Sequence, residues 1–173
     1  MNVNELINKI KQIALNQHVK SVYDGDVYES WNSAEVKYSS VNVGLENISY
    51  DSNLCTYTVV LYYADRLLQD KANVNSIYSD GIRVLQSILN NLNQVDGVDV
   101  TFPVNYTPFE QQFMDYLAGV YATVEIVCES ELGLCDIDDF DELEITPEFD
   151  VEDNNTELHH NTCTKNKLVW EPF

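Results

Sequence analysis

Residues 55–64 read CTYTVVLYYA, and this stretch predicts the centre of a β-sheet. β-Branched and aromatic residues fill it, as is typical of strands, and residues 59–64 are apolar at nearly every position. A continuous apolar run of this length indicates an inner strand that is covered on both faces. Residues 36–49 show a second strand pattern and residues 50–53 are turn formers, so the two runs predict a hairpin with long arms.

Apolar spacing outside the hairpin predicts two amphipathic helices. Residues 3–19 carry apolar side chains three and four positions apart, and so do residues 74–92, where Asn73 is placed to cap the start. Turn residues follow the first helix at 23–26, and Gly97 ends the second pattern. Further strands are expected at residues 27–31, 98–104 and 118–128, with a turn at residues 106–108. The order predicts an α+β fold, a mainly antiparallel sheet with two helices packed on one face.

The formal charge excludes several classes of function. The chain has 29 Asp and Glu against 9 Lys and Arg, a net charge of −20. Such a surface repels phosphate backbones and anionic lipids, so neither sequence-independent nucleic-acid binding nor membrane docking is expected. No apolar run approaches the roughly 18 residues of a membrane-spanning helix, and residues 1–20 lack the apolar stretch of a secretory signal. We expect a soluble protein whose four cysteines are free thiols.

Acidic residues are distributed unevenly along the chain. Residues 125–173 hold 15 acids and 2 bases, whereas residues 1–124 hold 14 acids and 7 bases. Apolar residues of the C-terminal part stand singly among the acids, so this part cannot build a core of its own. We therefore expect a core domain at residues 1–129 and an extended acidic C-terminal arm at residues 130–173. The arm residues expected to bind a partner are Phe140, Phe149, Leu168, Val169, Trp170 and Phe173.

Two groups of arm residues have the donor types of metal sites. The zinc-like group consists of His159, His160 and Cys163, with Cys135 or Cys128 as a fourth ligand. Adjacent histidines on an extended chain point to opposite sides, so a solvated tail with a free thiol is the favoured interpretation. The carboxylates of the second group are Asp136, Asp138, Asp139, Asp141 and Glu142.

The carboxylate group does not match the calcium-loop template. Counted from Asp136, the fifth position is Phe140 and the sixth is Asp141, where the template needs an oxygen ligand and a glycine. Weak divalent binding stays open, and a solvated or base-seeking acidic run is favoured. We predict neither a cofactor nor a metal.

Catalytic motifs are missing from the sequence. His18 has no cysteine, serine or paired carboxylate near it in a suggestive motif, and the chain contains no GxGxxG, P-loop or GxSxG pattern. The sequence therefore predicts that the protein is not an enzyme. Its 11 tyrosines, many on predicted strands, favour a protein whose role is contact with other proteins.

Four stretches resemble tail-terminator and head-tail connector proteins of tailed bacteriophages. The sequence is most similar to the versions found in crAss-like and other Bacteroidales gut phages. These stretches are YDGDVYE at residues 23–29, LYYADRLLQD at 61–70, ANVNSIYSDGIRVL at 72–85 and YTPFEQQFMDYLAGVYATVEI at 106–126. They are fold-and-pattern features and carry no catalytic signature.

The resemblance implies a structural virion protein. Its subunits would assemble into a ring of six or twelve copies in the portal, neck or tail region, bind the rings above and below, and let DNA pass through the lumen without specific binding. The protein would then be found in the virion, and in the host cytoplasm during assembly. Two alternatives are a ring adaptor in the tail barrel of a short-tailed phage and an acidic DNA-mimic regulator of a host protein.

Overall fold

The computed structural model describes residues 1–31, 36–51, 53–110, 116–129, 163–164 and 167–168. The chain divides into two compact units, Met1–Glu131 and Leu132–Phe173. In the second unit, β7 (Cys163–Thr164) and β8 (Lys167–Leu168) pair in antiparallel orientation. Most of residues 130–173 lie outside the described residues. The acidic arm and the domain boundary after residue 129 therefore stay predictions.

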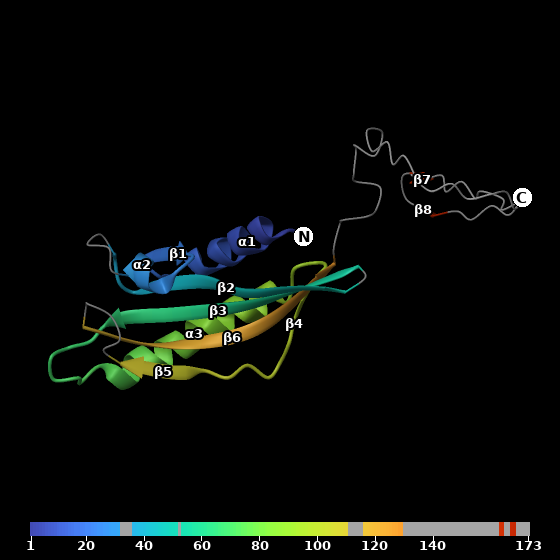
Figure 1. Cartoon of the computed structure of the whole chain (residues 1–173). Coiled ribbons are helices and arrows are strands. Elements are labelled where there is room, and N and C mark those ends of the chain that lie inside the picture. Colours follow the sequence, from blue (N-terminus) through green and yellow to red (C-terminus); the bar gives the residue numbers. More distant parts are fainter. Residues whose placement is uncertain (32–35, 52, 111–115, 130–162, 165–166, 169–173) are drawn as a thin grey trace, which may run out of the picture. The chain divides into compact units, whose positions relative to one another are not determined.

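A mixed sheet of six strands forms the first unit (Figure 1). The strands pair in the order β1-β2-β3-β6-β4, and β5 also pairs with β6. All pairs are antiparallel except β1 with β2, which are parallel. The predicted α+β class is confirmed, with a parallel pair inside the sheet that was expected to be mainly antiparallel. The six strands are β1 (Ser21–Asp24), β2 (Ser40–Asp51), β3 (Leu54–Arg66), β4 (Val98–Val100), β5 (Thr107–Glu110) and β6 (Leu117–Glu129).

Two helices, α1 (Val3–Leu15) and α3 (Val74–Leu92), cover one face of this sheet. Figure 1 shows α3 running behind β3 and β6, the two strands that it contacts most. Asn2 starts α1 with a capping box: Asn2 Oδ1 accepts from the Glu5 amide and Glu5 Oε2 accepts from the Asn2 amide, each at 3.0 Å. The helix residues buried against the sheet are Leu6, Ile10, Ala14, Ile77, Val84, Leu85, Ile88, Leu89 and Leu92.

A third helix, α2 (Val27–Trp31), replaces the strand predicted at residues 27–31. Its two buried side chains, Val27 and Trp31, are four positions apart, which places them on one side of a helix. Asp26 starts α2, because its Oδ1 accepts from the Tyr28 amide at 2.7 Å. The turn predicted at residues 23–26 was also misplaced, since residues 21–24 form β1.

Among the described residues, those that cover the sheet face opposite α1 and α3 lie at one end of it. Trp31 packs there edge-on against Tyr62 of β3, with ring centroids 6.1 Å apart, and lies 6.2 Å from the ring of Phe109 in β5. Residues 107–110 form a strand where a turn was predicted at residues 106–108, because they pair with β6 and bury Phe109. β3 is an inner strand as predicted, with Leu61 buried toward the helices and Ala64 toward α2.

A β-bulge in β2 keeps its apolar residues on one face. Val41, Val43 and Leu45 occupy odd positions, but the next apolar residues, Ile48 and Tyr50, occupy even ones. The register with β3 shifts between Leu45 and Asn47, so one extra residue absorbs the change of phase. Ile48 pairs with Tyr57 and Tyr50 with Cys55, which belong to the core under the helices. The apolar residues of β2 therefore all lie on the helix-covered face.

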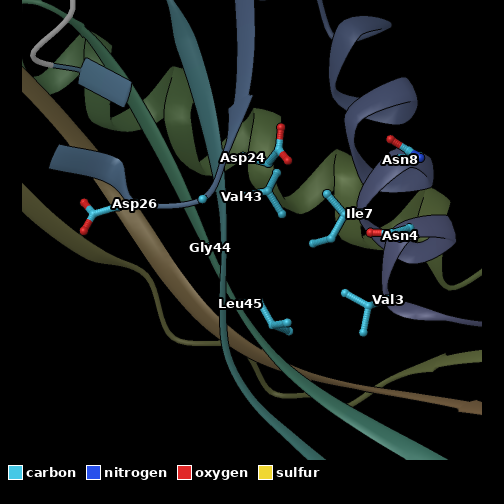
Figure 2. Close-up of a pocket in the computed structure, with 10 residues that line it drawn as sticks. Val3, Asn4, Ile7, Asn8, Asp24, Asp26, Val43, Gly44 and Leu45 are labelled. Carbon is cyan, nitrogen blue, oxygen red and sulfur yellow. The ribbon is translucent and has the colours of Figure 1, made fainter. Parts of the chain in front are cut away.

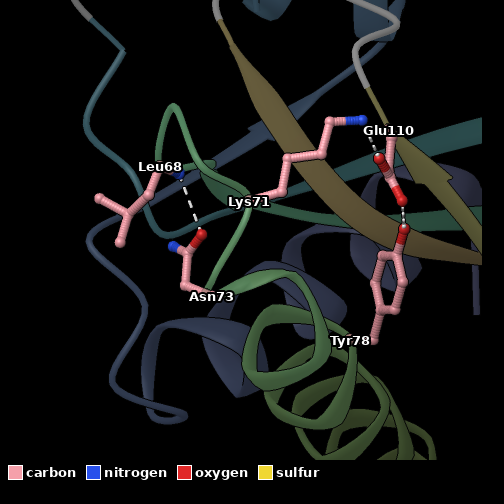
Figure 3. A network of polar contacts seen from close by, with 5 residues as sticks. All are labelled: Leu68, Lys71, Asn73, Tyr78 and Glu110. Atoms are coloured by element: carbon pink, nitrogen blue, oxygen red, sulfur yellow. Dashed lines mark hydrogen bonds and ion pairs between the residues drawn. The ribbon is translucent and has the colours of Figure 1, made fainter.

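Asn73 precedes α3, but its side chain makes no capping bond to the helix. It turns back to the preceding loop instead, where Oδ1 accepts from the Leu68 amide at 2.9 Å (Figure 3). Nδ2 donates to the Arg66 carbonyl, also at 2.9 Å. The prediction that Asn73 caps the helix with its side chain was therefore wrong. The side-chain amide of Asn73 thus uses both its oxygen and its nitrogen, and it satisfies two backbone groups of the short loop at once.

Glu110 connects β5 to the start of α3. Its carboxylate accepts from Lys71 Nζ at 2.8 Å and from the Tyr78 hydroxyl at 3.0 Å, as Figure 3 shows. These two hydrogen bonds lower the pKa of Glu110, and the bond from Lys71 has the larger effect. Burial, together with the bond to Glu110, raises the pKa of Tyr78 to about 12. Both donors stay protonated at neutral pH, so the contact holds the short strand β5 in place across the physiological range.

Candidate interaction surfaces

The first candidate surface is the free edge of β2, which we define as residues 44–50. β1 pairs only with the start of β2, from Ser40 to Val43. The chain then turns away at Gly25, whose φ is +94° and whose amide donates to the Val43 carbonyl at 3.1 Å. Beyond that point no strand among the described residues pairs with this side of β2. Its backbone groups therefore form an open template for another strand.

A groove of about 490 Å³ lies between α1 and the start of this edge (Figure 2). Val3 and Ile7 of α1 face it from one side, and Leu45 of β2 from the other, which gives it an apolar wall on each side. The remaining lining residues are Asn4, Asn8, Asp24, Gly25, Asp26, Val43 and Gly44. The groove continues the line of β1 past the point where β1 ends.

Large apolar side chains are exposed along the same edge. Leu45 is 37% exposed, Ile48 48% and Tyr50 55%. All three lie on the helix-covered face of β2, on the part of the strand that pairs only with β3. The burial changes sharply within one strand: β2 is buried up to Val43 and exposed from Leu45 onward. A row of exposed apolar residues on an open strand edge is typical of a contact surface.

The charges around the edge are mainly acidic. Asp24 and Asp26 line the groove, and Glu46 stands at the bulge of β2. Lys11 Nζ forms an ion pair with Asp24, and no lysine or arginine lines the groove. The surface therefore combines apolar side chains with a net negative charge.

The second candidate surface is the open half of the sheet face opposite α1 and α3. Glu125 and Thr123 of β6 are exposed on it, beside Thr56 and Thr58 of β3, which are half-buried. The strand register puts four acids on this half, and no lysine or arginine of the described strands. The basic residue that β3 contributes to this face is Arg66. It lies at the other end of the strand, where its guanidinium carbon is 5.8 Å from the centre of the Tyr38 ring. The four acids are Asp51, Asp99, Glu125 and Glu129.

Most of the predicted partner-binding residues cannot be placed on either surface. Phe140, Phe149, Val169, Trp170 and Phe173 lie outside the described residues. Leu168 lies in β8, where its backbone pairs with Cys163. The role predicted for these six residues therefore stays a prediction.

The predicted metal ligands are likewise placed only in part. His159, His160, Cys135 and the carboxylates of residues 136–142 lie outside the described residues. Cys128 is a buried free thiol beside Cys55 on the neighbouring strand, and burial raises its pKa. The part of the chain that the structure describes contains no group of three His, Cys, Asp or Glu side chains suited to a metal.

His18 follows α1, exposed and with a φ of +63°. The described residues place it in no metal-ligand cluster, and it does not line the groove beside β2. The structure thus gives His18 no role in either candidate surface.

Sequence reasoning missed the free edge of β2. One signal was available, because the apolar positions of residues 41–50 change from odd to even at Glu46. That change of phase indicates a bulge, and bulges are common at sheet edges. The four-residue strand that covers only the start of β2 gives no such signal.

Comparison with known proteins adds no family to this picture. No protein-family model matches the chain, and no curated protein matches it. Among the helices that the structure describes, none has both the length and the apolar character needed to cross a membrane.

Proposed function

We propose that the chain is a structural subunit of a tailed phage. Copies of it form a ring of six or twelve subunits in the portal, neck or tail region, where the ring joins its neighbours and lets DNA pass. The observation that carries this proposal is that one sheet has both candidate surfaces. A free apolar strand edge suits contact between subunits. The open half of the opposite face, where the described strands place four acids and no lysine or arginine, suits a passage for DNA.

The acidic open face supports the part of the proposal that concerns DNA. Duplex DNA carries a dense negative charge, and each lysine or arginine that touches a phosphate adds affinity by releasing counterions. A ring that binds its passing DNA would slow it. Asp99, Glu125 and Glu129 repel phosphates instead, and Thr123, the next residue of β6 on this face after Glu125, is neutral. In this proposal the open half of the face lines the lumen.

The exposed edge supports the part that concerns assembly. Rings grow when one surface of a subunit binds a different surface of the next and the rotation closes. An open strand edge with Leu45, Ile48 and Tyr50 exposed meets the need for such a surface. The acidic arm, with its predicted contacts at Phe140, Phe149, Leu168, Val169, Trp170 and Phe173, would reach neighbouring copies and the rings above and below.

Quantitative mass spectrometry of purified particles tests this function. Particles of the tailed phage that encodes the chain should contain six or twelve copies for each portal ring. Particles without the chain would contradict the proposal. In a particle reconstruction, a position in the tail barrel of a short tail would identify the adaptor alternative. A protein found only outside particles, bound to one basic host protein, would favour the DNA mimic.

A further inference from the structure

The free edge of β2 also has features that define what can bind to it. The edge offers backbone donors and acceptors over residues 44–50, so the occupant must be an extended segment. The exposed side chains of Leu45, Ile48 and Tyr50, with the apolar walls of the groove, require apolar residues in that segment. Asp24 already forms an ion pair with Lys11, but Asp26 and Glu46 favour basic residues in the occupant.

One stretch of the chain itself has the apolar and basic residue types that this edge favours. Residues 165–170 read KNKLVW, and they contain the two lysines of the strongly acidic part beyond residue 125, followed directly by three apolar residues. Lys167 and Leu168 form β8, and the strand that pairs with β8 among the described residues is β7. Six residues match the length of the seven-residue edge.

We propose that residues 165–170 of a second copy of the chain add to the free edge of β2 as an extra strand. Leu168 and Trp170 pack against Ile48 and Tyr50 on the helix-covered face. Lys165 and Lys167 alternate with them and point to the opposite face, where Asp26 and Glu46 act on Tyr62. The proposal rests on the proposed ring assembly and names one contact within it. The strand that binds this edge is residues 165–170, although other basic and apolar segments share part of this chemistry.

The contact can be mapped by photo-crosslinking in the full chain. Leu168 is replaced by the photoreactive residue benzoylphenylalanine, and these copies are mixed with isotope-labelled copies of the natural sequence. After illumination, mass spectrometry should find the crosslink on residues 44–50 of the labelled copy. The same photoreactive residue at Leu68, an exposed position on the loop before α3, should not crosslink to that edge.

A second variant tests the chemistry of the edge. Ile48→Lys puts a charge where the apolar side chain of Leu168 packs and removes an exposed apolar contact, so the yield of the crosslink should fall about tenfold, the change that 1.4 kcal/mol produces. Leu68→Lys adds the same charge elsewhere and should leave the yield unchanged. Since Ile48 is 48% exposed, the variant should unfold at the same temperature as the natural protein.

The outcomes separate this contact from the proposed function. A crosslink within a single copy, or one outside residues 44–50, overturns the contact while rings can still form. A ring of the expected mass without any crosslink to the edge also overturns the contact and leaves the ring function standing. A monomeric chain without crosslinks overturns both.

Discussion

Gly119→Ala should destabilise the protein by about 3 kcal/mol or more, because it overpacks a site where backbones meet. Gly119 lies in β6, between its partners Ala64 of β3 and Phe109 of β5. A Cβ at this position would lie 1.9 Å from the Tyr63 carbonyl oxygen and 2.7 Å from Cζ of Phe109. The nearer atom belongs to the backbone of a strand paired on both sides, so it cannot move away without disturbing the sheet.

Urea denaturation measures the effect, with Gly44→Ala as the matched control. Gly44 also lies in a strand, but a Cβ there would meet nothing closer than 3.7 Å. The control should change the free energy of unfolding by no more than about 0.5 kcal/mol. Equal midpoints for the two variants would show that β3 and β6 are not packed as closely as the structure has them.

Trp31→Ala should cost about 3–5 kcal/mol, the range for removing a large buried aromatic side chain. Trp31 is 1% exposed and joins α2 to Tyr62 and Phe109. It is therefore the main contact between α2 and the far face of the sheet. Without it, α2, which has five residues, has no other large buried side chain to hold it.

Trp31→Phe provides the control for this variant. It keeps an aromatic ring between Tyr62 and Phe109 and should lose clearly less stability than the alanine variant in the same urea titration. If Trp31→Ala unfolds at the midpoint of the natural protein, the packing of α2 on the sheet is wrong.

The elements that could be predicted from the sequence are those with long internal periodicity. α3 has apolar residues at helical spacing over five turns, and β3 and β6 are continuous apolar or alternating strands. The short elements were not predicted correctly. β1 has four residues and is a strand only because β2 lies beside it, which is a contact between distant residues. Val27 and Trp31 fit a five-residue helix by their spacing, but their residue types favour strands.

The candidate site was predicted even less completely, for a physical reason. Composition located the acidic arm, but it gives no information about which strand edge stays open. That depends on where β1 ends against β2 and on the bulge after Leu45, both of which are set by pairing. The partner contacts predicted for the aromatic and aliphatic residues of the arm rest on the neighbouring sequence alone. Ile48 had the pattern of an ordinary strand residue, and Tyr50 was placed in the turn predicted at residues 50–53, although β2 continues to Asp51.

The mass of the purified protein under native conditions tests the ring proposal most directly. The full chain should form one closed species of six or twelve copies. A chain that ends at residue 130 should keep its cooperative unfolding, because Met1–Glu131 is a compact unit, and should form fewer or smaller assemblies. A full chain that remains a monomer at every concentration tested would contradict the account.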